Sequence, residues 1–262
     1  METDYPSIED LGLSSEQLEA VEFVVEFTRQ MVFLAFPGHK TSASASNLIK
    51  EVYRVADDLL SGCLKSGTKL PCKEGCFWCC FLQVKVTPLE VMCIVDYLHS
   101  HLEPGEISEL QQQLVKTDDI TRGMDGQQRV CAKMMCPLLV DGKCLVYPVR
   151  PIVCRFYHSQ NLSDCKAILD QGGGNMMIRR DISGLSIGIL AGLIEGLRQA
   201  GLQTRLLELT TGLRIAVDGP GSELVKRWLS GEPAFVEAEI AGAKKIESFY
   251  RALVEELAEP LC

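Results

Sequence analysis

The chain has 262 residues, of which 47% are hydrophobic, and a formal net charge of −9. A chain of this length can bury a full core without covalent crosslinks. The acidic balance argues against a nucleic-acid partner, because a phosphate backbone binds a basic surface. The first residues show no signal-peptide pattern, and no apolar stretch is long enough to span a membrane. We therefore expect a cytoplasmic protein with neither a nucleic-acid nor a membrane partner.

The region before and just after the first cysteines has clear secondary-structure signals. Apolar residues recur every three to four positions over 14–36, and again over 46–62, which predicts two amphipathic helices. Apolar and polar residues alternate over 82–86, which predicts a short strand. The residues Thr-Pro-Leu-Glu at 87–90 then match a capping box with proline at the first helical position, so a third helix is predicted to begin there.

The middle of the chain is more polar. Residues 103–130 are predicted to form a short helix followed by a mobile loop. The Asp-Gly pair at 141–142 predicts a β-hairpin turn, in which Leu139 faces Cys144. In that register Cys136 projects to the face opposite Cys144. Either a bulge brings these two sulfurs together, or they serve different centres.

Helical periodicity returns in the last third, with helices predicted over 184–200, 203–217, 221–230 and 234–258. Glycines recur at every fourth position of the first of these helices and form one stripe. Because glycine costs up to about 1 kcal/mol per helical site relative to alanine, the stripe predicts that another backbone approaches closely. We expect this contact within the fold in preference to a dimer interface. The stripe consists of Gly184, Gly188, Gly192 and Gly196.

Eight of the twelve cysteines fall in two short blocks. In a reducing compartment such clusters bind metal more often than they form disulfides. Thiolates are soft ligands that suit zinc, iron–sulfur clusters or copper(I). The first block ends in two adjacent cysteines, an awkward arrangement for a single tetrahedral zinc unless one sulfur serves another centre or stays free. The candidate metal ligands are Cys72, Cys76, Cys79, Cys80, Cys136, Cys144, Cys154 and Cys165.

Several residues near the blocks have candidate supporting roles. Cys131 is a possible spare ligand, and His158 follows Cys154 at a spacing at which zinc sites recruit histidine. Nearby bases are either donors to the sulfurs or ordinary surface residues; they are Lys133, Lys143, Arg150 and Arg155. The remaining cysteines are expected to be unligated, the first two buried and the last exposed: Cys63, Cys93 and Cys262.

The two blocks together resemble the bacterial YkgJ-type cysteine-cluster family, which is named for a CxxCxxCC motif and regarded as zinc- or iron-chelating. The resemblance covers residues 68–170, and the two separated motifs agree in order. One departure is the three-residue gap between Cys72 and Cys76, where the family name has two, which leaves Cys72 the less secure ligand. In the second motif the matching positions are Cys136, Pro137, Asp141, Gly142, Cys144, Tyr147, Arg150, Pro151, Cys154, Arg155 and Cys165.

The resemblance implies metal binding and leaves the reaction open. The family includes flagellin lysine N-methylases, for which an iron–sulfur cluster and S-adenosylmethionine are implied. Three functions follow: a metal-chelating protein, an iron–sulfur protein lysine methyltransferase, or a thiol redox sensor. An iron–sulfur cluster or iron is slightly preferred over zinc because of the adjacent cysteine pair, and S-adenosylmethionine is expected only for the methyltransferase. The sequence leaves open whether the protein binds a protein partner and whether it is an enzyme.

The spacing of Cys72, Cys76 and Cys79, with Trp78 before the last, also matches the cluster loop of radical S-adenosylmethionine enzymes. Those enzymes are barrels of repeated strand–helix units, whereas this sequence predicts few strands. The predicted fold is mostly α, with a small cysteine-rich metal module that contains a short β-hairpin. This module, 68–170, is expected to pack between an N-terminal helical segment, 1–67, and a C-terminal helical segment, 171–262.

Overall fold

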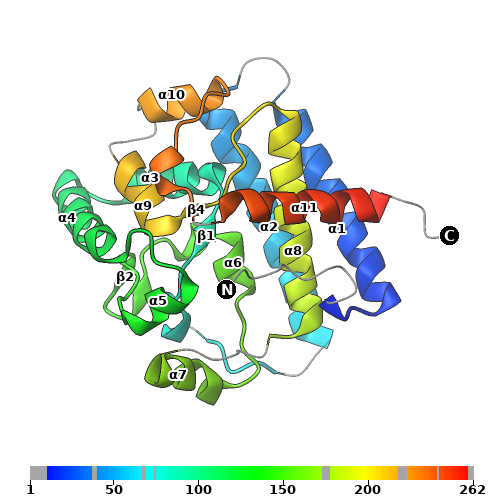
Figure 1. Ribbon diagram of the computed structural model, residues 1–262, viewed down its shortest axis with the longest axis horizontal. Coiled ribbons are helices and arrows are strands. Elements are labelled where there is room, and N and C mark those ends of the chain that lie inside the picture. Colours follow the sequence, from blue (N-terminus) through cyan, green and yellow to red (C-terminus); the bar gives the residue numbers. More distant parts are fainter. Residues whose placement is uncertain are drawn as a thin grey trace.

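The computed structural model of this chain is mostly helical, as predicted (Figure 1). In the part of the chain that it describes, eleven α-helices accompany two small antiparallel sheets of two strands each. None of these helices is both long enough and apolar enough to cross a lipid bilayer. The described residues are 11–36, 40–66, 69–73, 75–172, 178–217, 223–240 and 242–258.

The elements lie in the following order along the chain. The helices are α1 (Ser15–Ala35), α2 (Ser42–Ser66), α3 (Pro88–His101), α4 (Pro104–Thr121), α5 (Gly126–Cys131), α6 (Ile152–Phe156), α7 (Leu162–Gln171), α8 (Arg180–Gln199), α9 (Leu209–Ala216), α10 (Glu223–Leu229) and α11 (Ala243–Ala258). The short 3-10 helices are η2 (Trp78–Phe81), η3 (Tyr147–Val149) and η4 (Val236–Ala238). The strands are β1 (Lys85–Val86), β2 (Leu139–Val140), β3 (Lys143–Cys144) and β4 (Leu207–Glu208).

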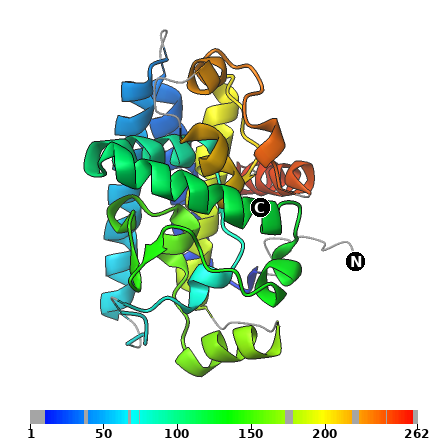
Figure 2. The same cartoon turned by 90° about the vertical axis from the view of Figure 1, so that its left-hand side faces the viewer.

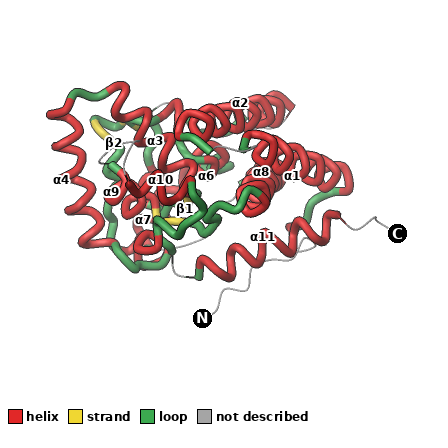
Figure 3. The backbone as a smooth tube through the Cα atoms, turned by 90° about the horizontal axis from the view of Figure 1, so that it is seen from above, coloured by secondary structure: helices red, strands yellow, loops and turns green. Residues whose placement is uncertain are grey.

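Helices α1 and α8 lie side by side, and the glycine stripe of α8 is in their contact (Figures 1 and 3). A Cβ atom added at Gly192 would stand 2.4 Å from the carbonyl oxygen of Val25, and one at Gly196 would stand 2.5 Å from the Cβ of Val32. The prediction of close packing within the fold is therefore confirmed. The N-terminal and C-terminal helices touch each other directly, so the cysteine segment lies beside them and does not separate them.

The predicted capping box at the start of α3 is present and links this helix to the cysteine segment. Thr87 Oγ1 accepts the amide of Glu90 at 3.3 Å, and Glu90 Oε2 accepts the amide of Thr87 at 2.8 Å. The other carboxylate oxygen of Glu90 accepts the amide of Ile152, the first residue of α6, at 2.8 Å. Burial raises the pKa of Glu90, although these amide donors oppose the shift. One buried carboxylate thus fixes the start of two helices that are far apart in the sequence.

The predicted helix over 203–217 is wrong in its first half. The helix α9 begins only at Leu209, because the preceding residues form β4 and pair with β1. Leu207 of β4 also forms an isolated bridge with Glu239. Because Glu239 is held in this bridge, the helix predicted over 234–258 begins only at Ala243. The strand predicted over 82–86 is present but limited to β1. Long-range backbone pairing has overridden the local helical period.

The prediction of a short helix and a loop over 103–130 is also wrong. The structure has two helices there, α4 and α5, and α4 alone covers 18 residues. Pro104 stands at the first position of α4, and Glu103 and Glu106 complete a capping box, a signal that the polar composition obscured. One face of α4 is buried against the core through the residues Ile107, Leu110, Leu114, Thr117, Asp118 and Thr121.

The buried carboxylate of Asp118 joins α4 to α9. Its Oδ2 accepts hydrogen bonds from Arg122 Nη2 at 2.5 Å and Arg214 Nη1 at 2.6 Å, and its Oδ1 accepts the hydroxyl of Thr211. Burial tends to raise the pKa of Asp118, but these donors outweigh it and hold the pKa below its ordinary value. Because the carboxylate form is favoured in the folded state, Asp118 stabilises the fold at neutral pH.

We expect Asp118→Asn to lose roughly 1–3 kcal/mol of unfolding free energy at neutral pH, the usual range for hydrogen bonds to charged groups. A lowered folded-state pKa adds stability above the unfolded value of about 3.9 and loses it as the pH falls through the folded value. The gap between wild type and variant should therefore be complete above about pH 5 and shrink as the pH falls further in urea titrations. Asp119→Asn, at the exposed next position, should change stability little. A gap that stays constant with pH would contradict this role.

Candidate metal centre

The cysteine segment runs from the lower left to the centre of Figure 1, where β2, α7 and α6 are labelled (Figures 1 and 2); β3 pairs with β2, and η2 packs on α7. A small hydrophobic cluster supports it, separate from the main core. The buried members of this cluster come from α5 and α7, and η2 packs against them through Trp78 and Phe81. Lys166 of α7 also places its ammonium 5.4 Å from the centre of the Trp78 ring. These contacts fix the first cysteine block against the helix that carries Cys165.

None of the eleven cysteines within the described residues forms a disulfide. A disulfide framework is therefore absent from that part of the chain, and Cys262 lies outside it. Of the eight candidate ligands, Cys165 is buried and the other seven are half-buried. Cys93 is buried as predicted, Cys63 is half-buried, and Cys131 is exposed, with its thiol 3.2 Å from the carbonyl oxygen of Gly172. The candidate ligands are thus unpaired with one another in disulfides and wholly or partly sheltered from bulk water.

The described residues do not hold their side chains in the arrangement that a bound metal ion would require. No three histidine, cysteine, aspartate or glutamate side chains within the described ranges are grouped as they would be around a metal ion. The candidate thiols instead hydrogen bond to backbone groups and to one another. What the structure does bring together is the two blocks themselves.

The first block meets the hairpin through a backbone hydrogen bond. The amide of Cys136 donates to the carbonyl oxygen of Cys80 at 2.7 Å. The predicted hairpin register, Leu139 opposite Cys144, is confirmed. Asp141 and Gly142 have φ angles of 50° and 73°, as a type I′ turn requires. The hairpin therefore presents its two cysteines beside η2.

Cys136 and Cys144 are electrostatic neighbours despite their register. Burial raises the pKa of Cys136 to about 12, the Leu138 amide opposes this, and Cys144 contributes a further increase. Burial likewise raises the pKa of Cys144, opposed by the amide of Val146. A turn in which the Leu139 amide donates to the Cys136 carbonyl at 3.0 Å bends the chain just before β2. The chain therefore turns just after Cys136, ahead of the paired strands.

Cys154 faces the same region from α6. Burial raises its pKa well above the ordinary value, and Cys79, Cys136 and Cys144 add to the increase. The thiol of Cys80, hydrogen-bonded to that of Cys79, has a pKa raised by this bond, by burial, and by the nearby Cys136 and Cys154. Thiols from the first block, the hairpin and α6 therefore lie within electrostatic reach of one another.

Cys72 and Cys165 meet at Ser159, a residue that the sequence did not single out. Burial raises the pKa of Cys72, a backbone hydrogen bond from Ser159 lowers it, and Cys76 and Cys165 raise it further. Burial also raises the pKa of Cys165, while the Ser159 side chain lowers it. The position of Ser159, directly after His158, gives no sequence signal for this role.

The four candidate bases have different roles. The charge of Arg150 acts on the sulfurs, since it lowers the pKa of both Cys79 and Cys144. Its guanidinium also stacks 4.0 Å from the ring centre of Tyr147. Arg155 points elsewhere: its Nη1 binds Asp57 at 2.6 Å, Nε donates to the Arg150 carbonyl, and Nη2 to the Pro148 carbonyl. Neither Lys133 nor Lys143 is among the charges that act on the pKa values of Cys72, Cys80, Cys136, Cys144, Cys154 and Cys165.

Two further groups act on the pKa of Cys136, and His158 of the same segment is a candidate metal donor. Arg129, which is 2% exposed, and Glu208 both act on the pKa of Cys136, and nothing in their sequence context indicates this. His158 has a buried Nδ1 atom without a hydrogen-bond partner among the described residues. Burial lowers the pKa of His158, so its neutral form is favoured. A neutral imidazole with an unsatisfied nitrogen is the form that binds metal.

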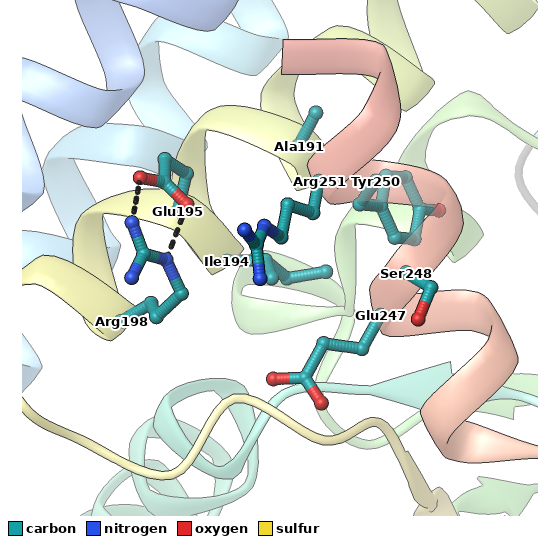
Figure 4. Close-up of a pocket in the computed structure, with 8 residues that line it drawn as sticks. All are labelled: Ala191, Ile194, Glu195, Arg198, Glu247, Ser248, Tyr250 and Arg251. Carbon is teal, nitrogen blue, oxygen red and sulfur yellow. Dashed lines mark hydrogen bonds and ion pairs between the residues drawn. The ribbon is translucent and has the colours of Figure 1, made fainter. Parts of the chain in front are cut away.

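A hollow of about 220 Å³ lies on another part of the molecule, between α8 and α11 (Figure 4). Its charged lining is already paired: Arg198 binds Glu195 at 2.7 Å, and Arg251 binds Glu255, outside the hollow, at 2.9 Å. Glu247 accepts the hydroxyl of Thr204. No cysteine lines this hollow, so it offers no support for thiol chemistry.

No protein-family model, no curated protein and no solved structure matches this chain. The donor set itself fits a soft metal, because it consists of buried or half-buried thiols that form no disulfide.

Proposed function

We propose that this chain is a metal-binding protein whose ligands are the eight clustered cysteines, with an iron–sulfur cluster or iron preferred and zinc as the alternative metal. When bound, the metal would crosslink the first block, the hairpin, α6 and α7, and its binding energy would contribute to folding. Arg150 would offset part of the negative charge of the thiolates.

The observation that supports this proposal best is the meeting of the two blocks. The backbone bond between Cys136 and Cys80 holds the hairpin against η2, and Cys154 on α6 lies within electrostatic reach of both. Burial raises the pKa of most of these thiols and keeps them protonated in the metal-free protein, so metal binding would displace protons from sulfur. Coordination requires the thiols to rotate about their Cα–Cβ bonds from partners within the protein to a common ion.

We expect the protein, isolated without oxygen, to contain stoichiometric metal. Cys76→Ser and Cys79→Ser should each reduce the metal content and lower the melting temperature, because each removes a ligand that links the two blocks. Cys63→Ser is the matched control, since Cys63 lies on α2 away from both blocks, and its metal content should equal that of wild type. Elemental analysis and thermal unfolding, before and after chelator treatment, provide the measurements.

Full metal retention and unchanged melting in both ligand variants would refute the proposal. A brown protein that contains iron and acid-labile sulfide indicates a cluster, whereas a colourless one that contains zinc indicates a chelating module. The lysine methyltransferase alternative additionally requires S-adenosylmethionine binding and methyl transfer. The redox-sensor alternative requires that mild oxidants release the metal and form disulfides.

A further inference from the structure

We infer that the hollow between α8 and α11 binds a small zwitterion, namely a free α-amino acid with an aliphatic side chain (Figure 4). Its volume of about 220 Å³ is below the range of roughly 300–1,000 Å³ that holds drug-sized ligands, so the ligand must be small. The hollow has charged groups of both signs and an apolar wall. It is lined by no cysteine and does not depend on the proposed metal binding.

Two arginines supply the donors for a carboxylate. Arg198 of α8 binds Glu195 through its Nε and Nη2 atoms, each at 2.7 Å, and Arg251 of α11 binds Glu255 through its Nε at 2.9 Å. Within the described residues, no hydrogen bond occupies Nη1 of Arg198 or either Nη atom of Arg251. In Figure 4 the side chain of Arg251 extends from α11 toward α8, which carries Arg198. The remaining nitrogens can therefore donate to a carboxylate, the group that a guanidinium matches best.

The buried residue Glu195 fixes Arg198 in place. The Glu195 side chain is 9% exposed, and its Oε1 also accepts a hydrogen bond from Gln199 Nε2 at 2.9 Å. The hydrogen bond from Arg198 lowers the pKa of Glu195, although burial opposes the shift, so this carboxylate is ionised at neutral pH. Because Arg198 is positioned before the ligand arrives, less side-chain entropy is lost on binding.

Glu247 supplies the acceptor for an ammonium group. It stands four residues before Arg251 on α11, so both side chains are on the same face of the helix. One carboxylate oxygen accepts the hydroxyl of Thr204, and the other is 3.9 Å from Arg205 Nε, which is too long for a hydrogen bond. An ionised carboxylate has about four acceptor sites, so Glu247 retains sites for the hydrogens of an ammonium group.

The apolar wall and the balance of charge favour an amino acid over other small ligands. Ala191 and Ile194 line the hollow from the same helix as Arg198 and offer a surface for an aliphatic side chain. The net charge of −9 disfavours a simple anion, and the arginines disfavour a simple cation, whereas a zwitterion matches both signs. The side chains of Arg198 and Arg251 are 51% and 63% exposed, so the ligand can enter without unfolding.

The test is calorimetric titration of the full chain with L-leucine, for which we expect a Kd on the order of 1 mM or tighter, given so small a ligand. 4-Methylpentanoate lacks the ammonium group and 3-methylbutylamine lacks the carboxylate. Each should bind at least about tenfold more weakly, because each loses a charge-assisted contact. Arg251→Gln and Glu247→Gln should weaken leucine binding by a similar factor.

Arg54→Gln is the matched control, because Arg54 is also 63% exposed in a helical ion pair but does not line the hollow. Its affinity for leucine should equal that of wild type, and circular dichroism should show that all three variants are folded. Three results would each overturn the inference: no saturable binding of leucine by wild type, equal affinity for either single-charge analogue, or unchanged affinity in a folded Arg251→Gln or Glu247→Gln variant. Metal content is measured separately, so failure here leaves the proposed metal binding intact.

Discussion

Arg155→Leu should lower the unfolding free energy by about 1.5–3 kcal/mol, the range for losing hydrogen bonds to a charged group. The Arg155 side chain is 1% exposed and binds Asp57 on α2 and the carbonyl groups of Pro148 and Arg150. Its guanidinium also stacks 4.2 Å from the ring centre of Tyr53. Leucine fills part of the volume but leaves two carbonyl groups and a carboxylate without their donor. Urea unfolding monitored by circular dichroism measures the loss.

Arg54→Leu is the matched control for this prediction. Arg54 also belongs to an ion pair on α2, with Glu51 at 2.9 Å, but its side chain is 63% exposed. Exposed pairs contribute little because water and salt screen them, so this variant should unfold at the wild-type urea concentration. If the two variants were equally stable, the buried position of Arg155 would have no special importance. Metal content of Arg155→Leu, measured in parallel, reports whether α6 still presents Cys154.

Gly192→Ala should destabilise the protein by about 3 kcal/mol, although alanine is the better helix former. The added Cβ would stand 2.4 Å from the Val25 carbonyl oxygen and 2.8 Å from the Cβ of Thr28. Both atoms belong to α1 and neither is the flexible end of a side chain, so the helices must move apart. Thermal unfolding should show the loss.

Gly62→Ala is the corresponding control within α2, because an added Cβ there meets no atom within 4 Å. It should stabilise the protein by up to about 1 kcal/mol. The two identical substitutions are thus expected to have opposite signs. A stabilised Gly192→Ala variant would show that α1 and α8 do not need to approach so closely.

Local signals predicted the elements whose determinants lie next to each other in the sequence. The capping box at Thr87 and Glu90 set the start of α3, and the Asp141-Gly142 turn set the hairpin register. The glycine stripe of α8 predicted a close helix contact, although not that α1 is the partner. The polar composition of α4 concealed its buried face, because a helix whose other side is solvated has a low average hydrophobicity.

The sequence identified the residues of the candidate site better than it identified the contacts between them. The eight thiols and Arg150 could be selected from spacing and composition. The roles of Ser159, Arg129 and Glu208 near the thiols depend on contacts between segments that are distant in the sequence. Arg155, a candidate donor to sulfur by proximity in sequence, instead binds Asp57 of α2.

The sequence by itself determined where α3 begins, which residues carry sulfur, and that the cysteines fall in two blocks, because caps, turns and spacing act over a few residues. Tertiary structure alone decided that residues 207–208 form a strand with β1 and that Cys136 lies against Cys80. Both outcomes are backbone hydrogen bonds between distant segments. Such bonds form only when the intervening chain has folded, since the loss of chain entropy must be offset by the packing of everything between them.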